Sequence, residues 1–89
     1  MNNEEALFKL PPHTAIGIER YVDGHMPVGS FLEAVFANDL FKAVAYADPD
    51  NLNALKQIVS YVFWETPGEC RGSSENVKAW LAQTKGEEV

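Results

Sequence analysis

Apolar residues recur at every third or fourth position along most of this chain, and this spacing constrains its fold more than any other feature. Residues three and four apart share one face of an α-helix, so the spacing predicts helices that each bury one side. No segment alternates strictly between apolar and polar residues with hairpin turns on either side, which a sheet would need. The sequence therefore predicts an all-α fold, a small bundle of about four to five helices in a single domain. The residues with this spacing are Ala15, Ile18 and Val22; Leu32, Val35, Phe36, Leu40, Ala43, Val44 and Ala47; Leu52, Leu55, Ile58, Val59, Val62 and Phe63; and Val77, Trp80 and Leu81.

The first two predicted helices have recognisable ends. Pro12 suits the first turn of a helix and Gly24 suits the position just after its end, which predicts a helix over residues 12–23. Ser30 followed three residues later by Glu33 matches a capping box and opens a second helical stretch that reaches residue 47. Asn38-Asp39 interrupts the apolar stripe of that stretch, so it is either one helix or two.

Two further helices follow. Asp48 can cap a helix that begins at Pro49, and Thr66-Pro67-Gly68 stops it. Its apolar residues predict a broad buried face. Ser73 or Ser74, with Glu75 after it, opens a last helix. The helical domain then covers residues 10–84, between a loose arm over residues 1–9 and a frayed tail over residues 85–89.

The charge balance excludes several classes of function. The 89 residues include 13 acidic and 7 basic side chains, which gives a net charge of −6 and a pI near 4.7. Binding of nucleic acid through a broad basic face requires clustered lysine and arginine, and so does a polybasic membrane surface. Neither is expected for this chain.

The sequence offers little for a metal site or for export. Cys70 is the only cysteine, so no intramolecular disulfide forms. Cys70, His13 and His25 are well separated in the sequence, so they do not give the close pair of ligands that is typical of a structural zinc site. We expect no metal and no cofactor. The apolar stretches fall short of the ~18–20 residues of a membrane span, and the start Met-Asn-Asn-Glu-Glu is unlike a secretory signal. The expected location is a reducing cytoplasm.

A cysteine and a histidine raise the hypothesis of a hydrolase. Such an enzyme needs the Cys70 thiolate within hydrogen-bond reach of His13 or His25, together with donors for an oxyanion. Any chain with one cysteine and two histidines contains these residue types, so their presence is not specific for a hydrolase. A turn cysteine without a chemical role is the simpler interpretation.

Two other groups of residues suggest binding. Arg20, with His13 and Tyr21 around Pro11-Pro12, forms a candidate site for a small molecule or nucleotide, although a structural salt bridge is the default role of such an arginine. Trp64 and Phe63 lie at or beyond the edge of the apolar stripe of their helix, close to Tyr61. Tryptophan and tyrosine are frequent anchors of protein interfaces, but a small domain also needs aromatic residues to close its core. The candidate partner-binding residues are Trp64, Tyr61, Phe63, Tyr21 and Arg20.

Several segments resemble small proteins encoded by tailed bacteriophages and prophages, a group without an assigned activity. The resemblance implies a phage-encoded protein that works in a bacterial cytoplasm, and it carries no reaction. The chain departs from the pattern at Arg71, where the group has an aromatic residue. The matching segments are Leu10-Pro11-Pro12-His13, Gly17-Ile18-Glu19-Arg20-Tyr21-Val22, Pro27-Val28-Gly29-Ser30-Phe31-Leu32 and Asn38-Asp39-Leu40, and then Ala47-Asp48, Asp50-Asn51, Cys70-Arg71-Gly72-Ser73 and Ala79-Trp80-Leu81.

The function expected from these observations is non-enzymatic. We expect a small acidic protein that binds a host or phage protein, including surfaces that normally hold nucleic acid, or that pairs with a second copy of itself. Binding of a small molecule or nucleotide near residues 11–21 is the alternative, and a Cys–His hydrolase is a third hypothesis.

Overall fold

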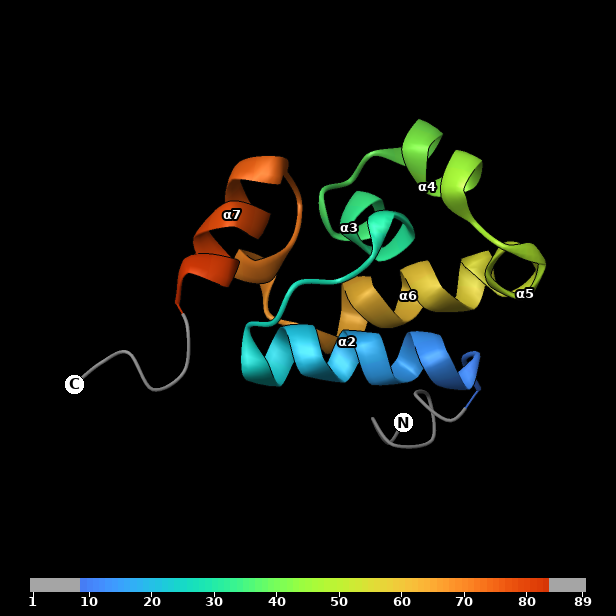
Figure 1. Ribbon diagram of the computed structural model, residues 1–89, viewed down its shortest axis with the longest axis horizontal. Helices are drawn as coiled ribbons and strands as arrows, with labels where there is room; N and C mark the ends of the chain where they lie inside the picture. Colours follow the sequence, from blue (N-terminus) through green and yellow to red (C-terminus); the bar gives the residue numbers. More distant parts are fainter. Residues whose placement is uncertain (1–8, 84–89) are drawn as a thin grey trace.

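A computed structural model describes residues 9–83 of the chain (Figure 1). This part contains six α-helices, one short 3-10 helix and no strand, which confirms the all-α prediction. The number of α-helices is one more than the four to five predicted, because the predicted helix that begins at Pro49 is divided in two. The predicted arm and tail lie outside the described residues, except for Lys9. The elements are α2 (Pro12–Gly24), α3 (Ser30–Phe36), α4 (Leu40–Tyr46), α5 (Pro49–Asn53), α6 (Leu55–Glu65), η1 (Gly68–Cys70) and α7 (Ser74–Ala82).

The stretch from residue 30 to residue 47 forms two helices. Asn38 adopts a left-handed conformation with φ 62°, which an α-helix cannot continue. Asp39 then caps α4, because its Oδ1 accepts a hydrogen bond from the Lys42 backbone N–H at 3.2 Å. The sequence left open whether this stretch is one helix or two, and the structure shows two.

The stretch from residue 49 to residue 65 is divided as well, although a single helix was predicted. Asp48 caps α5 as expected, accepting from the Asn51 N–H at 2.8 Å, and Pro49 is its first residue. The chain leaves helical geometry at Ala54, with φ −103° and ψ 13°. Figure 1 shows α5 end-on while α6 runs across the view, so the break changes the direction of the chain. That change leaves Leu52 exposed, against the prediction that it is buried.

Two predicted helix ends also differ. The left-handed residue after α2 is His25, with φ 55°, and not Gly24. Ser30 is the first residue of α3 and Gly29 is its cap, with no side-chain capping hydrogen bond, so the predicted capping box does not form. Ser73 does cap α7, accepting from the Asn76 N–H at 3.1 Å.

The core lies where α2, α3, α6 and α7 meet. Gly17 lets α2 approach α3 closely, since a Cβ there would lie 3.0 Å from Leu32 Cδ1. Tyr21 and Phe36 are fully buried with ring centroids 4.2 Å apart, and the Tyr21 hydroxyl donates to the Cys70 carbonyl at 2.7 Å. The buried apolar residues are Leu10, Ile18, Tyr21, Phe31, Leu32, Ala34, Phe36, Ala43, Ile58, Val62, Cys70, Val77 and Trp80.

Helix α7 is attached to the end of α2 by two side chains. The Trp80 indole N–H donates to the Tyr21 carbonyl at 2.8 Å, and the His25 ring N–H donates to the Trp80 carbonyl at 2.8 Å. The two rings pack with centroids 4.3 Å apart. His25 is therefore a structural residue of this junction.

Within residues 9–83, every helix is too short or too polar to cross a membrane.

Candidate functional site

The C-terminal half of α6 exposes aromatic side chains. Trp64 is 74% exposed and Phe63 is 54% exposed, and their rings meet edge to face with centroids 4.8 Å apart. The sequence placed Phe63 at the margin of the buried face of this helix and Trp64 beyond it. Only Ile58 and Val62 of α6 are fully covered, so the predicted broad buried face is narrower than expected. We call Tyr61, Phe63 and Trp64 the aromatic face.

Arg71 holds Phe63 in place from the turn after η1. Its Nη2 donates to the Phe63 carbonyl at 2.9 Å, and its guanidinium carbon lies 5.1 Å from the centroid of the Phe63 ring. The Arg71 Nε is buried and has no hydrogen-bond partner among residues 9–83. Arg71 was not among the residues that the sequence predicted for partner binding. It lies eight positions after Phe63 and beyond a turn, and no local pattern in the sequence indicates that the two meet.

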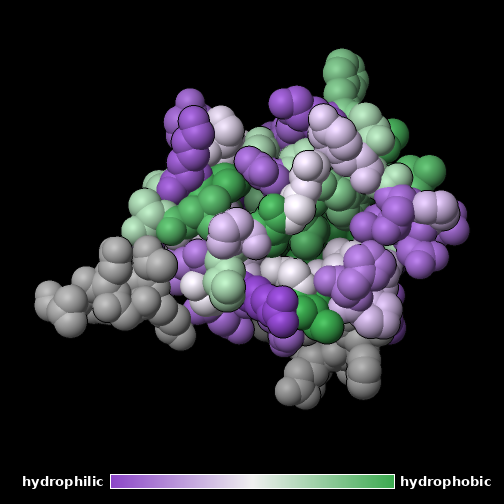
Figure 2. All heavy atoms as spheres, in the orientation of Figure 1, coloured by the Kyte–Doolittle hydropathy of each residue, from purple (hydrophilic) through white to green (hydrophobic). Residues whose placement is uncertain are grey.

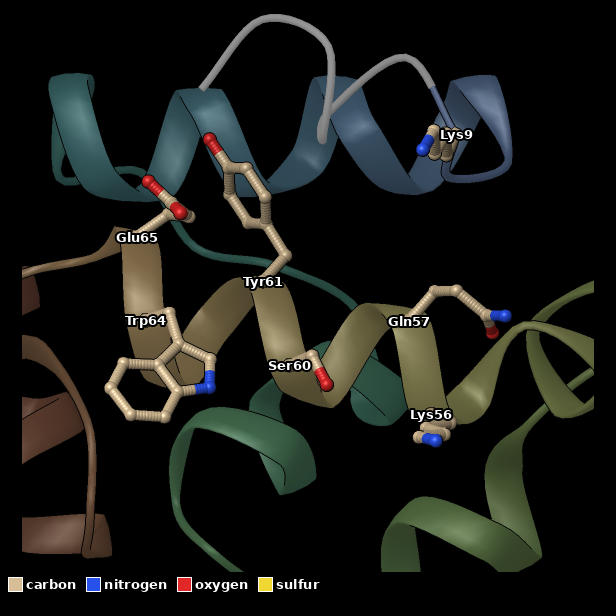
Figure 3. Close-up of a pocket in the computed structure, with 7 residues that line it drawn as sticks. All are labelled: Lys9, Lys56, Gln57, Ser60, Tyr61, Trp64 and Glu65. Carbon is tan, nitrogen blue, oxygen red and sulfur yellow. The ribbon is translucent and has the colours of Figure 1, made fainter. Parts of the chain in front are cut away.

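A cavity of about 330 Å³ opens beside Trp64 (Figure 3). In the close-up, Trp64 and Ser60 project from the same side of α6 while Tyr61 points toward α2. Glu65 lines the cavity near the C-terminal end of α6, and Lys56 lines it near the N-terminal end of the same helix. The cavity offers an apolar wall for a side chain of a partner, with hydrogen-bonding groups around it. Its lining residues are Lys9, Lys56, Gln57, Ser60, Tyr61, Trp64 and Glu65.

Carboxylates gather around Tyr61. Burial raises the pKa of the Tyr61 hydroxyl above its ordinary value, and the nearby charges of Glu65, Glu19 and Asp23 raise it further. These carboxylates make the immediate surroundings of the Tyr61 ring negative, while Lys9 and Lys56 add positive charge to the lining of the same cavity. The negative part of this surface attracts a positively charged group.

The chain matches no protein-family model, no curated protein and no solved structure. Its function must therefore be argued from its own surface.

A second cleft, of about 450 Å³, lies between α2 and the segments that lead into α3 and α5. It brings together His13 and Arg20, two of the three residues of the predicted ligand site, and it adds Tyr46, Asp48 and Asn51. His13 Nε2 lies 3.4 Å from an Asp48 carboxylate oxygen.

Tyr21 belongs to neither candidate site. The sequence proposed it for both the partner-binding and the ligand-binding residues, but the structure buries its side chain completely in the core. The helical spacing showed that Tyr21 lies beside the apolar stripe of α2. It did not show that Phe36 and Cys70 cover that side of the helix as well.

Cys70 is also enclosed. Its side chain is fully buried, and burial raises the pKa of the thiol above its ordinary value. A raised pKa reduces the thiolate fraction on which nucleophilic attack depends. Among residues 9–83, no hydrogen bond joins Cys70 to a histidine, and no group of three or more His, Cys, Asp or Glu side chains is placed to hold a metal ion.

A further exposed apolar surface lies on α4. Figure 2 shows hydrophobic side chains gathered over this helix, where Phe41 is 85% exposed and Leu40, Val44 and Tyr46 are also exposed. Unlike the aromatic face, this surface has no arginine stacked on one of its rings in the described part of the chain.

Proposed function

We propose that this protein acts by binding another protein through the aromatic face of α6. The observation that carries the proposal is the exposure of Trp64 on a helix whose other side already fills the core. Leaving so large an apolar side chain in water is unfavourable by roughly 25 cal/mol per Å² that burial would remove. Trp, Tyr and Arg are also the residues that most often dominate interface energies, and all three occur here with Phe63.

The charge of the surface supports a basic partner. The chain carries a net charge of −6, and the three carboxylates around Tyr61 outnumber the two lysines, Lys9 and Lys56, that line the cavity beside Trp64. A surface that normally holds nucleic acid is rich in lysine and arginine, so it complements this face. The resemblance to phage-encoded proteins supports a host or phage protein of the bacterial cytoplasm as the partner. Pairing of two copies is the weaker alternative, because it brings like charges together.

The proposal involves no catalytic step. It is supported by the burial of Cys70, the only thiol of the chain, and by the structural role of His25 at the α2–α7 junction.

The proposal is tested by capturing partners from a lysate of phage-infected bacteria and then measuring the binding of the purified partner. Trp64→Ala is expected to weaken that binding by about 2 kcal/mol or more, which is about thirtyfold in Kd. Phe41→Ala is the matched control, since it removes a still more exposed aromatic ring from a different helix. Its Kd is expected to change by less than about twofold.

Binding by the Trp64→Ala variant at the wild-type Kd would refute the proposal. An equal loss in both variants would indicate general adhesion of apolar surface and would also contradict it. Sedimentation of the isolated protein shows whether the partner is a different protein or a second copy of this chain. If two copies pair through the aromatic face, Trp64→Ala must reduce the self-association of the isolated protein.

A further inference from the structure

The cleft between α2, α3 and α5 has a polar floor. Asn51 is only 6% exposed, and its Oδ1 accepts a hydrogen bond from the buried Thr14 hydroxyl. The amide nitrogen of Asn51 makes no hydrogen bond to another residue of the range 9–83, and it is not sealed from solvent. This donor therefore faces water and is available to a group that enters the cleft.

The rim of the cleft carries a free positive charge. Arg20 is exposed, and within the described residues it makes no ion pair. His13 lies seven residues earlier on the same face of α2, about 10 Å along the helix axis. Asp48 pairs with His13 rather than with Arg20. The guanidinium therefore remains the group that an incoming anion meets, and its planar donors match a carboxylate or phosphate.

The remaining wall is apolar or aromatic. It includes Pro27, Val28, Phe31 and Tyr46. The volume of about 450 Å³ lies within the usual ~300–1,000 Å³ of small-molecule sites, which combine such walls with a few polar groups.

We propose that this cleft binds a small organic anion. Arg20 holds its carboxylate or phosphate, the Asn51 amide donates to a second acceptor, and the apolar wall packs against a flat ring. None of these residues lines the cavity beside Trp64, so this proposal does not depend on binding of a protein by the aromatic face.

The proposal is tested on the full chain by ¹H–¹⁵N NMR titration with adenosine monophosphate and with benzoate, which separate a phosphate source from a carboxylate source. Adenosine and benzyl alcohol are the matching uncharged probes. At least one anion is expected to give saturable shifts at the amides of Gly17, Gly29 and Ser30 and at the Asn51 side chain. The uncharged counterpart is expected to bind about tenfold more weakly or worse, since a hydrogen bond to a charged group is lost.

Arg20→Gln and Lys78→Gln provide a matched pair of variants, because each removes one exposed positive charge and Lys78 of α7 lies outside the cleft. Arg20→Gln is expected to weaken binding of the anion by about tenfold or more, while Lys78→Gln leaves it unchanged. Shifts of amides far from the cleft report whether each variant keeps its fold.

Three results would overturn the proposal. The first is the absence of saturable shifts for both anions up to about 10 mM, a range that reveals a Kd of 1 mM. The second is a set of shifts that lies outside the cleft. The third is equal binding by the uncharged probes or by the Arg20→Gln variant.

Discussion

The two tryptophans of the chain lie in opposite environments. Trp80 is 9% exposed and donates to the Tyr21 carbonyl, whereas Trp64 is 74% exposed and contacts Phe63. Both occur in helices with similar apolar spacing, so the difference arises from what packs over each of them. Individual side chains in this protein are thus assigned to core or surface by their neighbours in space.

This contrast gives a prediction for stability. Trp64→Ala is expected to change the free energy of unfolding by about 1 kcal/mol or less, because the ring is mostly in water. Trp80→Ala is expected to cost about 3–5 kcal/mol, since it leaves a cavity and removes the hydrogen bond from the indole N–H to the Tyr21 carbonyl. Urea denaturation of the two variants beside the wild type measures both values. A large loss of stability in Trp64→Ala would show that the ring belongs to the core.

A second prediction concerns the hydroxyl of Tyr21. Tyr21→Phe keeps the ring in the core but removes the donor to the Cys70 carbonyl. We expect a loss of about 1–2 kcal/mol in the free energy of unfolding at neutral pH, because a buried acceptor is left without a partner. Chemical denaturation measures it, and unchanged stability would mean that the carbonyl has another partner.

The same hydroxyl makes stability depend on alkaline pH. Burial, followed by the nearby Cys70 and Glu33, raises the pKa of Tyr21 in the folded protein above the value of about 10 in the unfolded chain. The folded state therefore retains a proton that the unfolded state releases, so stability is present below pH 10 and falls as the pH rises above it. Between about pH 8 and pH 10.5, wild type is expected to lose more stability than Tyr21→Phe. An equal loss in both proteins would contradict this.

At the scale of the element, short helices are ended and restarted by single residues. Asn38 in a left-handed conformation ends α3, and the carboxylate of Asp39 opens α4. Four of the six α-helices in residues 9–83 have nine or fewer residues, too few for stability on their own. Their caps and their packing must therefore hold them.

The cap of α4 provides a test at this scale. Asp39→Ala removes the acceptor for the Lys42 N–H and is expected to cost about 1 kcal/mol of stability. Asp39→Asn is the control, because asparagine caps helices about as well as aspartate. Its loss of stability is expected to be only a few tenths of the loss caused by Asp39→Ala. The measurement is urea denaturation. Equal losses in the two variants would assign the effect to charge and not to the cap.

At the scale of the whole molecule, side chains far apart in the sequence join the helices into one core. Tyr21 of α2 reaches Cys70 of η1, Thr14 of α2 reaches Asn51 of α5, and His25 reaches Trp80 of α7. These polar contacts fix how the helices pack, whereas apolar burial alone permits several arrangements.

The fold itself predicts a simple spectroscopic result. Far-ultraviolet circular dichroism is expected to show the two minima of a predominantly helical protein, because residues 9–83 contain helices and no strand. A spectrum with substantial strand content would contradict both the sequence-based prediction and the structure.

Local sequence determined the helical character of this chain and several of its boundaries. Asp48, Pro49 and Ser73 open helices where they were predicted to, and α6 ends at Glu65, directly before the predicted stop at Thr66. These features depend on backbone geometry and on hydrogen bonds within three or four residues, which the order of residues specifies directly. Helical spacing also placed Trp64 at or beyond the edge of the apolar stripe of its helix.

Only the tertiary structure decided which apolar faces are covered. The turn of the chain at Ala54 exposes Leu52, the packing of Phe36 buries Tyr21, and the fold places Arg71 over the ring of Phe63. Helical spacing gives the direction in which a side chain points, but burial depends on segments tens of residues away. The aromatic face and the cleft at Arg20 arise from those long-range contacts, and for that reason the sequence named some of their residues without showing which of them meet.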